Sequence, residues 1–173
     1  MGDSIAFEFD CAACGERHVG VPALGYDAPA PYDELDEEAR RTRATKTSET
    51  CVLEDEDGTH RFVRAVLEIP IHECDDVVSF GVWVSMSEKS FDEYHAVSDQ
   101  DVEAGWFGHL CNRLHGYPDT YALTTDVVHV GPGKRPFVHV QSRDQESHPL
   151  FVDQRSGLTR ERARELVTQL LHR

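Results

Sequence analysis

The spacing of apolar residues along this chain predicts a helix at its C-terminal end. From residue 158 onwards, apolar positions recur at intervals of three and four, which is typical of one face of an amphipathic helix. Thr159 stands where the N-cap of that helix is expected. The apolar stripe consists of Ala163, Leu166, Val167, Leu170 and Leu171. We therefore expect a C-terminal helix that buries this stripe.

The segments before that helix carry patterns typical of strands. Residues 50–71 form two strand-like runs around Asp57-Gly58, a strong signal for a hairpin turn. Residues 77–86 are apolar on nearly both faces and predict a central strand. Residues 121–142 predict a second hairpin, whereas residues 105–114 are ambiguous between strand and turn. Strands therefore follow one another mainly as hairpins.

Two short helices interrupt these strands. Asp36 can cap a helix whose first turn is acidic and whose later positions are basic, as the helix dipole favours. Ser87 can cap a second helix over residues 88–97. The alternation of strand and helix that a doubly wound parallel sheet requires is missing, so we expect an α+β fold. It would be one domain over residues 1–173.

In this fold, an antiparallel sheet is built from the hairpins, and the C-terminal amphipathic helix packs on it. Contacts to the helix would come from strand residues such as Val82, Val84 or Phe137. The N-terminal segment, residues 7–25, would form a C-x-x-C knuckle and an irregular arm.

Charge limits the kinds of partner. Acidic residues outnumber basic ones by 32 to 17, and the formal net charge is −15. Such a surface repels phosphate backbones and anionic lipid headgroups, so we expect neither nucleic acid nor membrane as a partner. A basic protein or a small, cationic ligand suits this charge better. A simpler interpretation is that the charge only keeps the protein soluble.

The cysteines and the N-terminal residues bear on the cellular compartment. The first residues contain no basic segment followed by an apolar run, so no signal peptide is expected. No apolar stretch approaches the ~18 residues of a membrane span. The five cysteines are an odd number, which argues against a disulfide framework. We expect reduced thiols and a cytoplasmic location.

The most specific chemical signal lies at residues 11–18. Cys11 and Cys14 form a C-x-x-C pair, Gly15 permits a tight turn, and His18 follows within reach. Thiolate and imidazole are the ligands that zinc prefers, and a C-x-x-C turn directs two sulfurs at one point. We therefore predict a structural zinc bound by Cys11, Cys14, His18 and Cys51, the last at the start of the first hairpin.

His60 is an alternative ligand on the same hairpin. If Asp57-Gly58 is a two-residue turn, Cys51 and His60 lie on one face about 13 Å apart, at roughly 3.4 Å per residue. One zinc cannot bind both, so His60 would replace another ligand. Redox chemistry is disfavoured because no helix is expected after Cys14. The plainest alternative is a pair of reduced thiols without metal.

Several segments together resemble a known family. C-x-x-C-G-x-x-H-x-G-x-P runs from Cys11 to Pro22. HRFVRAVLEIPI, FGVWVSMSEKSF, GYPDTYAL, RPFV and HPLFVDQRSGLT follow in order. With Cys51 before an acidic turn, this series resembles the bacterial domain of unknown function 2199 over nearly the whole chain. The resemblance implies a fold but no activity. It also directs attention to a possible cleft formed by Arg64, Glu68, Trp83 and His148.

Three functions fit these observations. The leading hypothesis is a non-catalytic, cytoplasmic domain with a structural zinc, which acts by binding a protein or a small ligand. The second is a zinc-dependent hydrolase-like enzyme with an open metal position and Glu16 or Glu68 as base. The third is an acidic immunity-type inhibitor of a basic protein. The number of protein ligands separates the first two, since a catalytic zinc retains a water.

Overall fold

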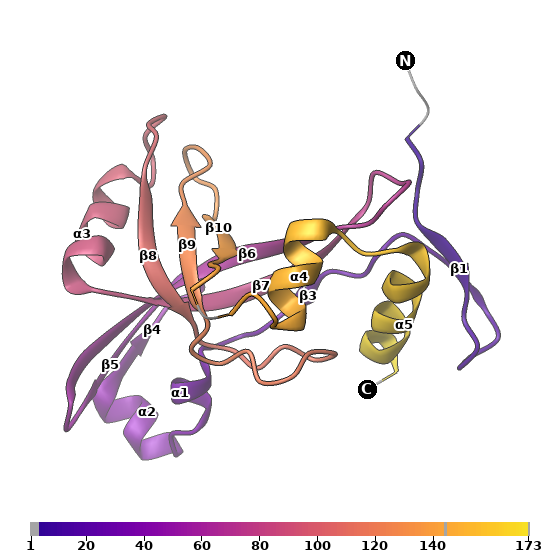
Figure 1. The fold of residues 1–173 in the computed structure, drawn as a ribbon. Helices are drawn as coiled ribbons and strands as arrows, with labels where there is room; N and C mark the ends of the chain where they lie inside the picture. Colours follow the sequence, from indigo (N-terminus) through magenta and orange to yellow (C-terminus); the bar gives the residue numbers. More distant parts are fainter. Residues whose placement is uncertain (1–3, 144, 173) are drawn as a thin grey trace.

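The computed structural model describes residues 4–143 and 145–172, and it shows a mixed α/β fold with a sheet-rich core (Figure 1). Within those residues there are ten strands and five helices. None of the five helices in these described residues is both long enough and apolar enough to span a membrane.

Five strands close into a barrel. These are β6 (Gly58–Pro70), β7 (Val77–Met86), β8 (Gly105–Leu110), β9 (Thr124–Val128) and β10 (Phe137–Val140). Each strand pairs antiparallel with the next, and β10 returns to β6 in parallel, with Phe137 opposite Val66. The expectation of a simple hairpin sheet is therefore corrected. The closing pair joins distant segments, and no local pattern encodes it.

Shorter strands extend the sheet on both sides of the β6–β7 pair. β5 (Thr50–Asp55) and β4 (Ala44–Lys46) continue beyond β6, and β3 (Leu24–Gly25) lies parallel to β7. The first hairpin turns one residue earlier than predicted, because Asp55 pairs directly with Gly58. The strand order is thus β3–β7–β8–β9–β10–β6–β5–β4.

The two faces of the strands form two cores. The main core contains alternating barrel residues such as Val63, Ala65 and Val84. The opposite face carries a second core, which consists of Cys51, Leu53, Phe62, Trp83 and Cys111. The segment with α1 (Ala30–Asp33) and α2 (Glu37–Arg43) covers this second core through Tyr26, Tyr32 and Leu35.

The predicted helix caps are confirmed. The side chains of Asp36, Ser87 and Thr159 accept hydrogen bonds from backbone amides at the starts of α2, α3 (Glu88–Val97) and α5 (Arg160–Leu171). Sequence reasoning missed α4 (Pro149–Ser156), whose N-cap is His148. Proline at the first helical position was the available signal.

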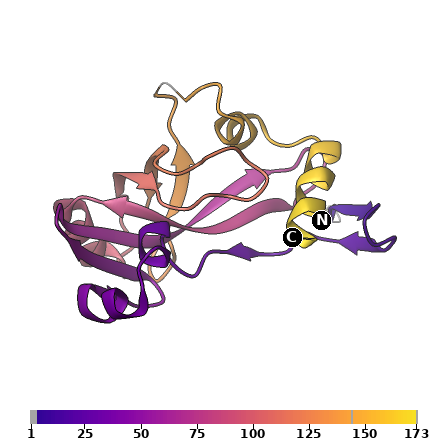
Figure 2. The same ribbon diagram turned by 90° about the horizontal axis from the view of Figure 1, so that it is seen from below.

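The C-terminal helix is present, but it lies away from the barrel. Figures 1 and 2 show α5 beside the N-terminal strand β1 (Glu8–Asp10), at the end of the molecule where β6 and β7 project beyond the barrel. Val82, Val84 and Phe137, the predicted contacts, belong to the barrel strands. The structure buries four residues of the stripe and leaves Leu171 36% exposed. Leu166 instead lies against the backbone at Gly116, where an added Cβ would come within 2.3 Å of Leu166 Cδ1.

Hydrogen bonds fix the N-terminal segment and the segment before α5 to the loop between β6 and β7. The amides of Ile5 and Phe7 donate to the carboxylates of Asp75 and Asp76 at 2.8 and 2.6 Å. On the other side of this loop, the amide of His72 donates to Leu158 O at 2.8 Å. The loop therefore places the N-terminal hairpin and the start of α5 side by side.

Candidate metal centre

A small hairpin presents the two cysteines of the C-x-x-C motif. β1 pairs antiparallel with β2 (Arg17–Val19). The amide of Cys11 donates to Glu16 O, and the amide of Gly15 donates to Cys11 O, both at 2.8 Å. Gly15 has a φ of 76°, a conformation that favours glycine. The predicted tight turn is therefore present, with Cys11 and Cys14 on it.

Aromatic packing holds the hairpin and orients His18. Phe7 and Phe9 are buried in the main core, whereas Glu8 and Asp10 are exposed, as strand alternation requires. Phe9 lies directly opposite His18, and their rings stack with centroids 5.3 Å apart. This cross-strand stack directs the imidazole of His18 towards the turn.

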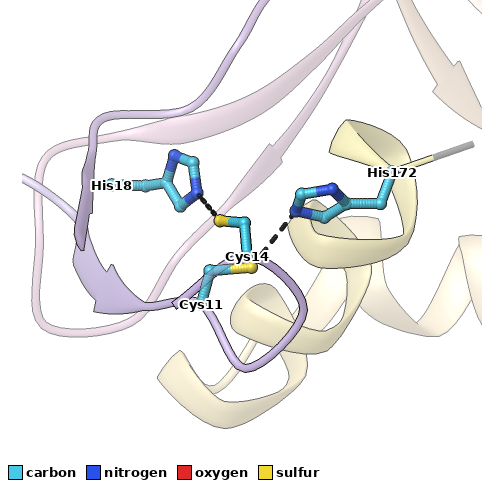
Figure 3. A group of neighbouring side chains, drawn as sticks. All are labelled: Cys11, Cys14, His18 and His172. Atoms are coloured by element: carbon cyan, nitrogen blue, oxygen red, sulfur yellow. Dashed lines mark hydrogen bonds between the residues drawn. The ribbon is translucent and has the colours of Figure 1, made fainter. Parts of the chain in front are cut away.

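Four side chains meet at the turn (Figure 3). Cys14 Sγ lies 3.3 Å from His18 Nε2, and Cys11 Sγ lies 3.2 Å from Nε2 of His172. All four candidate ligand atoms lie within 4.8 Å of one another. A tetrahedral zinc with usual bond lengths requires separations of about 3.3–3.8 Å between ligand atoms. Small side-chain adjustments would therefore let this group hold a metal ion.

The surroundings favour the thiolate form of Cys11. Desolvation raises the pKa of Cys11, but hydrogen bonds from the backbone at Cys14 and Ala13 and from His172 outweigh it and lower this pKa to about 6. Metals bind the thiolate, so this geometry favours the form that can act as a ligand.

His172 was not predicted from the sequence. It directly follows α5, and its amide donates to Thr168 O at 3.2 Å, which continues the last turn of the helix. The burial of the α5 stripe therefore positions this otherwise exposed histidine. No spacing rule connects a residue at the end of the chain to a C-x-x-C motif near its beginning, and a histidine just after an amphipathic helix was the only available signal.

The structure does not bring Cys51 to the other three predicted ligands. Cys51 lies in β5, fully buried in the second core, and burial raises its pKa to about 11. Because neighbouring apolar side chains surround it, it behaves as a core thiol. The alternative ligand His60 is also elsewhere, with Nε2 2.9 Å from Asp55 Oδ1. His172 occupies the place predicted for Cys51.

Trp83 and His148, two of the four residues of the possible cleft, make structural contacts instead. Trp83 is fully buried, and its indole N–H donates to Tyr26 O at 2.9 Å. His148 caps α4, accepting a hydrogen bond from the amide of Leu150. Both residues therefore have structural roles that the sequence interpretation did not distinguish from binding.

The fold and the site thus define an α/β protein with a closed barrel and a Cys/His group. The chain matches the family model described as an uncharacterized protein conserved in bacteria, DUF2199, over residues 10–158. It therefore belongs to this family. The match includes Cys11, Cys14 and His18 but ends before His172. No curated protein and no solved structure matches the chain.

Proposed function

We propose that this protein is a zinc-binding domain in which one structural zinc joins the N-terminal hairpin to the C-terminal helix. The convergence of two thiols and two imidazoles from the two ends of the chain is the observation that supports it. Such a set matches the soft, tetrahedral coordination that zinc prefers over the harder cations calcium and magnesium.

Four protein ligands favour a structural role over a catalytic one. A catalytic zinc usually has three protein ligands and keeps one position for water. Here Cys11, Cys14, His18 and His172 would complete the tetrahedron. We therefore propose a non-catalytic, cytoplasmic protein that acts by binding a partner. This partner would be either a basic protein or a small ligand. Hydrolase-like chemistry would require His172 to leave the metal.

The metal content of purified, untagged protein tests this proposal. We expect about one zinc per chain, with two sulfur ligands at ~2.3 Å and two nitrogen ligands at ~2.0 Å in X-ray absorption spectra. Replacement of Cys14 by serine should lower the zinc content. His172→Ala should replace one nitrogen ligand by water or weaken the binding.

Two variants of residues outside the group serve as controls. Cys51→Ser and His60→Ala should leave zinc content and coordination unchanged, because neither side chain belongs to the group. Protein without metal, or spectra with three sulfur ligands that change in Cys51→Ser, would overturn the proposal. If the coordination is unaltered in His172→Ala, His172 is not a ligand of the metal. The site would then have only three of the proposed protein ligands, which favours the catalytic alternative.

A further inference from the structure

A second possible site lies at the other end of the molecule from the Cys/His group. A hollow of about 480 Å³ lies between α1, β5 and the neighbouring strands β6 to β8. We call it the β5–β8 hollow, and its lining comprises Pro31, Glu34, Leu53, Asp55, His60, Phe62, Ser85, His109, Cys111, Tyr121 and Ala122. Its volume is within the range of about 300–1,000 Å³ that is usual for small-molecule sites.

The sheet supplies the floor of the hollow. Phe62 in β6 pairs with Ser85 in β7, which pairs in turn with His109 in β8, so these side chains form a row on one face. Leu53 and Phe62 are buried and belong to the second core. Leu53 and Phe62 therefore form an apolar part of the floor, which is built on rigid, hydrogen-bonded strands.

Polar groups surround this floor. His60 Nε2 lies 2.9 Å from Asp55 Oδ1, and this hydrogen bond lowers the pKa of the Asp55 carboxyl. The ring nitrogens of His109 have no hydrogen-bond partner within the described part of the chain; its ring instead meets the ring of Phe107 edge-on at 4.9 Å. Acceptor groups are thus available at the edge of the hollow.

The charge of the lining has one sign. Glu34 and Asp55 are its acidic residues, and no lysine or arginine belongs to it. Arg113 lies outside, 3.6 Å from Glu34 Oε1 and stacked over the ring of Tyr121 at 4.8 Å. This stacking holds the Tyr121 ring in place, and an aromatic ring adds a surface that attracts cations.

Covalent catalysis by the cysteine of the hollow is disfavoured. Burial raises the pKa of Cys111 to about 11, and its thiol donates to His109 O at 3.3 Å. A thiol held in this way is a weak nucleophile at neutral pH. The hollow is therefore suited to binding rather than to reaction.

We propose that the β5–β8 hollow binds a small organic cation, with an ammonium or amidinium group attached to an apolar body. The apolar body would lie on Leu53 and Phe62, and the cationic group would lie near the carboxylates of Asp55 and Glu34. An anion of the same size would meet two carboxylates and no lysine or arginine of the lining.

Phenethylamine is a suitable probe, and 3-phenylpropionate is its anionic match. We expect phenethylamine to cause saturable shifts of the amide NMR signals of Leu53, Phe62, His109 and Tyr121 in the full chain at pH 7. The phenylpropionate should bind at least about fivefold more weakly, which corresponds to about 1 kcal/mol for a partly exposed charge pair. Added salt should weaken the binding of phenethylamine.

Charge-neutral variants identify the residues responsible. Asp55→Asn and Glu34→Gln should each weaken phenethylamine binding about threefold, whereas Asp101→Asn, at an exposed position outside the lining, should not. If Asp55→Asn disturbs the hairpin spectrum, Glu34→Gln carries the test alone. Equal affinity for both probes, shifts confined to other regions, or unchanged affinity in Glu34→Gln would overturn the proposal. Cys14→Ser should bind phenethylamine normally, so this result is independent of the zinc proposal.

Discussion

Replacing His172 by alanine tests how the proposed zinc stabilises the fold. The side chain is exposed and follows the last residue of α5, so in metal-free protein its loss removes little packing. The substitution also removes the hydrogen bond between His172 Nε2 and Cys11 Sγ, so we expect the free energy of unfolding of the metal-free variant to lie within about 1 kcal/mol of that of the wild type. Any larger effect should appear only with zinc.

The expected effect with zinc follows from the positions of the ligands. Cys11, Cys14 and His18 are close in sequence, so the unfolded chain can also bind zinc through them, and such binding adds no stability. Only the bond to His172 distinguishes the folded chain, because it closes a loop of roughly 160 residues. Loop-closure entropy for a cross-link of this length is about 5 kcal/mol. We expect about 3–5 kcal/mol of zinc-dependent stability, all of it lost in His172→Ala.

Urea unfolding followed by tryptophan fluorescence can measure this difference. Wild type and His172→Ala would be compared with equimolar zinc and with excess chelator. His139→Ala, at an exposed histidine of β10, provides the matched control and should keep the zinc dependence of the wild type. Hydrogen exchange should show the gain from zinc in β1, β2 and the last turn of α5. Equal stabilisation of wild type and His172→Ala by zinc would refute the reasoning.

Three further predictions concern packing and charge. Gly116→Ala should destabilise the protein by about 2–4 kcal/mol in thermal unfolding, because the added Cβ would overlap Leu166. Gly133→Ala is the control: Gly133 also has a positive φ but faces open space, so this variant should cost only about 1 kcal/mol. Equal losses in the two variants would contradict the overlap. Leu166→Ala should cost about 2–5 kcal/mol in the same assay, and an unchanged midpoint would show that the α5 stripe is not part of the core. Arg135 donates two hydrogen bonds to Glu49, and this contact lowers the pKa of Glu49. Its contribution is therefore full above the usual glutamate pKa and disappears as pH falls through the lowered value, so Glu49→Gln should reduce the loss of stability on acidification, and identical pH profiles would contradict this.

Local features of the fold could be predicted from the sequence because neighbouring residues determine them. The caps Asp36, Ser87 and Thr159 each bond to an amide three residues ahead, so their effect is visible in a short window. The turn that presents Cys11 and Cys14 is local in the same way. The family resemblance, now shown by the family model over residues 10–158, rests on such short segments in order.

Long-range packing decided the rest. The barrel closes because Phe137 pairs with Val66, and the fourth candidate ligand is His172 because α5 packs beside the N-terminal hairpin. Cys51 had the appropriate chemistry but lies on the sheet face that Tyr26 and Tyr32 cover. Residue type and local spacing thus determined which side chains could bind a metal. Only the tertiary structure determined which of them meet, because these contacts depend on how buried faces fit together across distant parts of the chain.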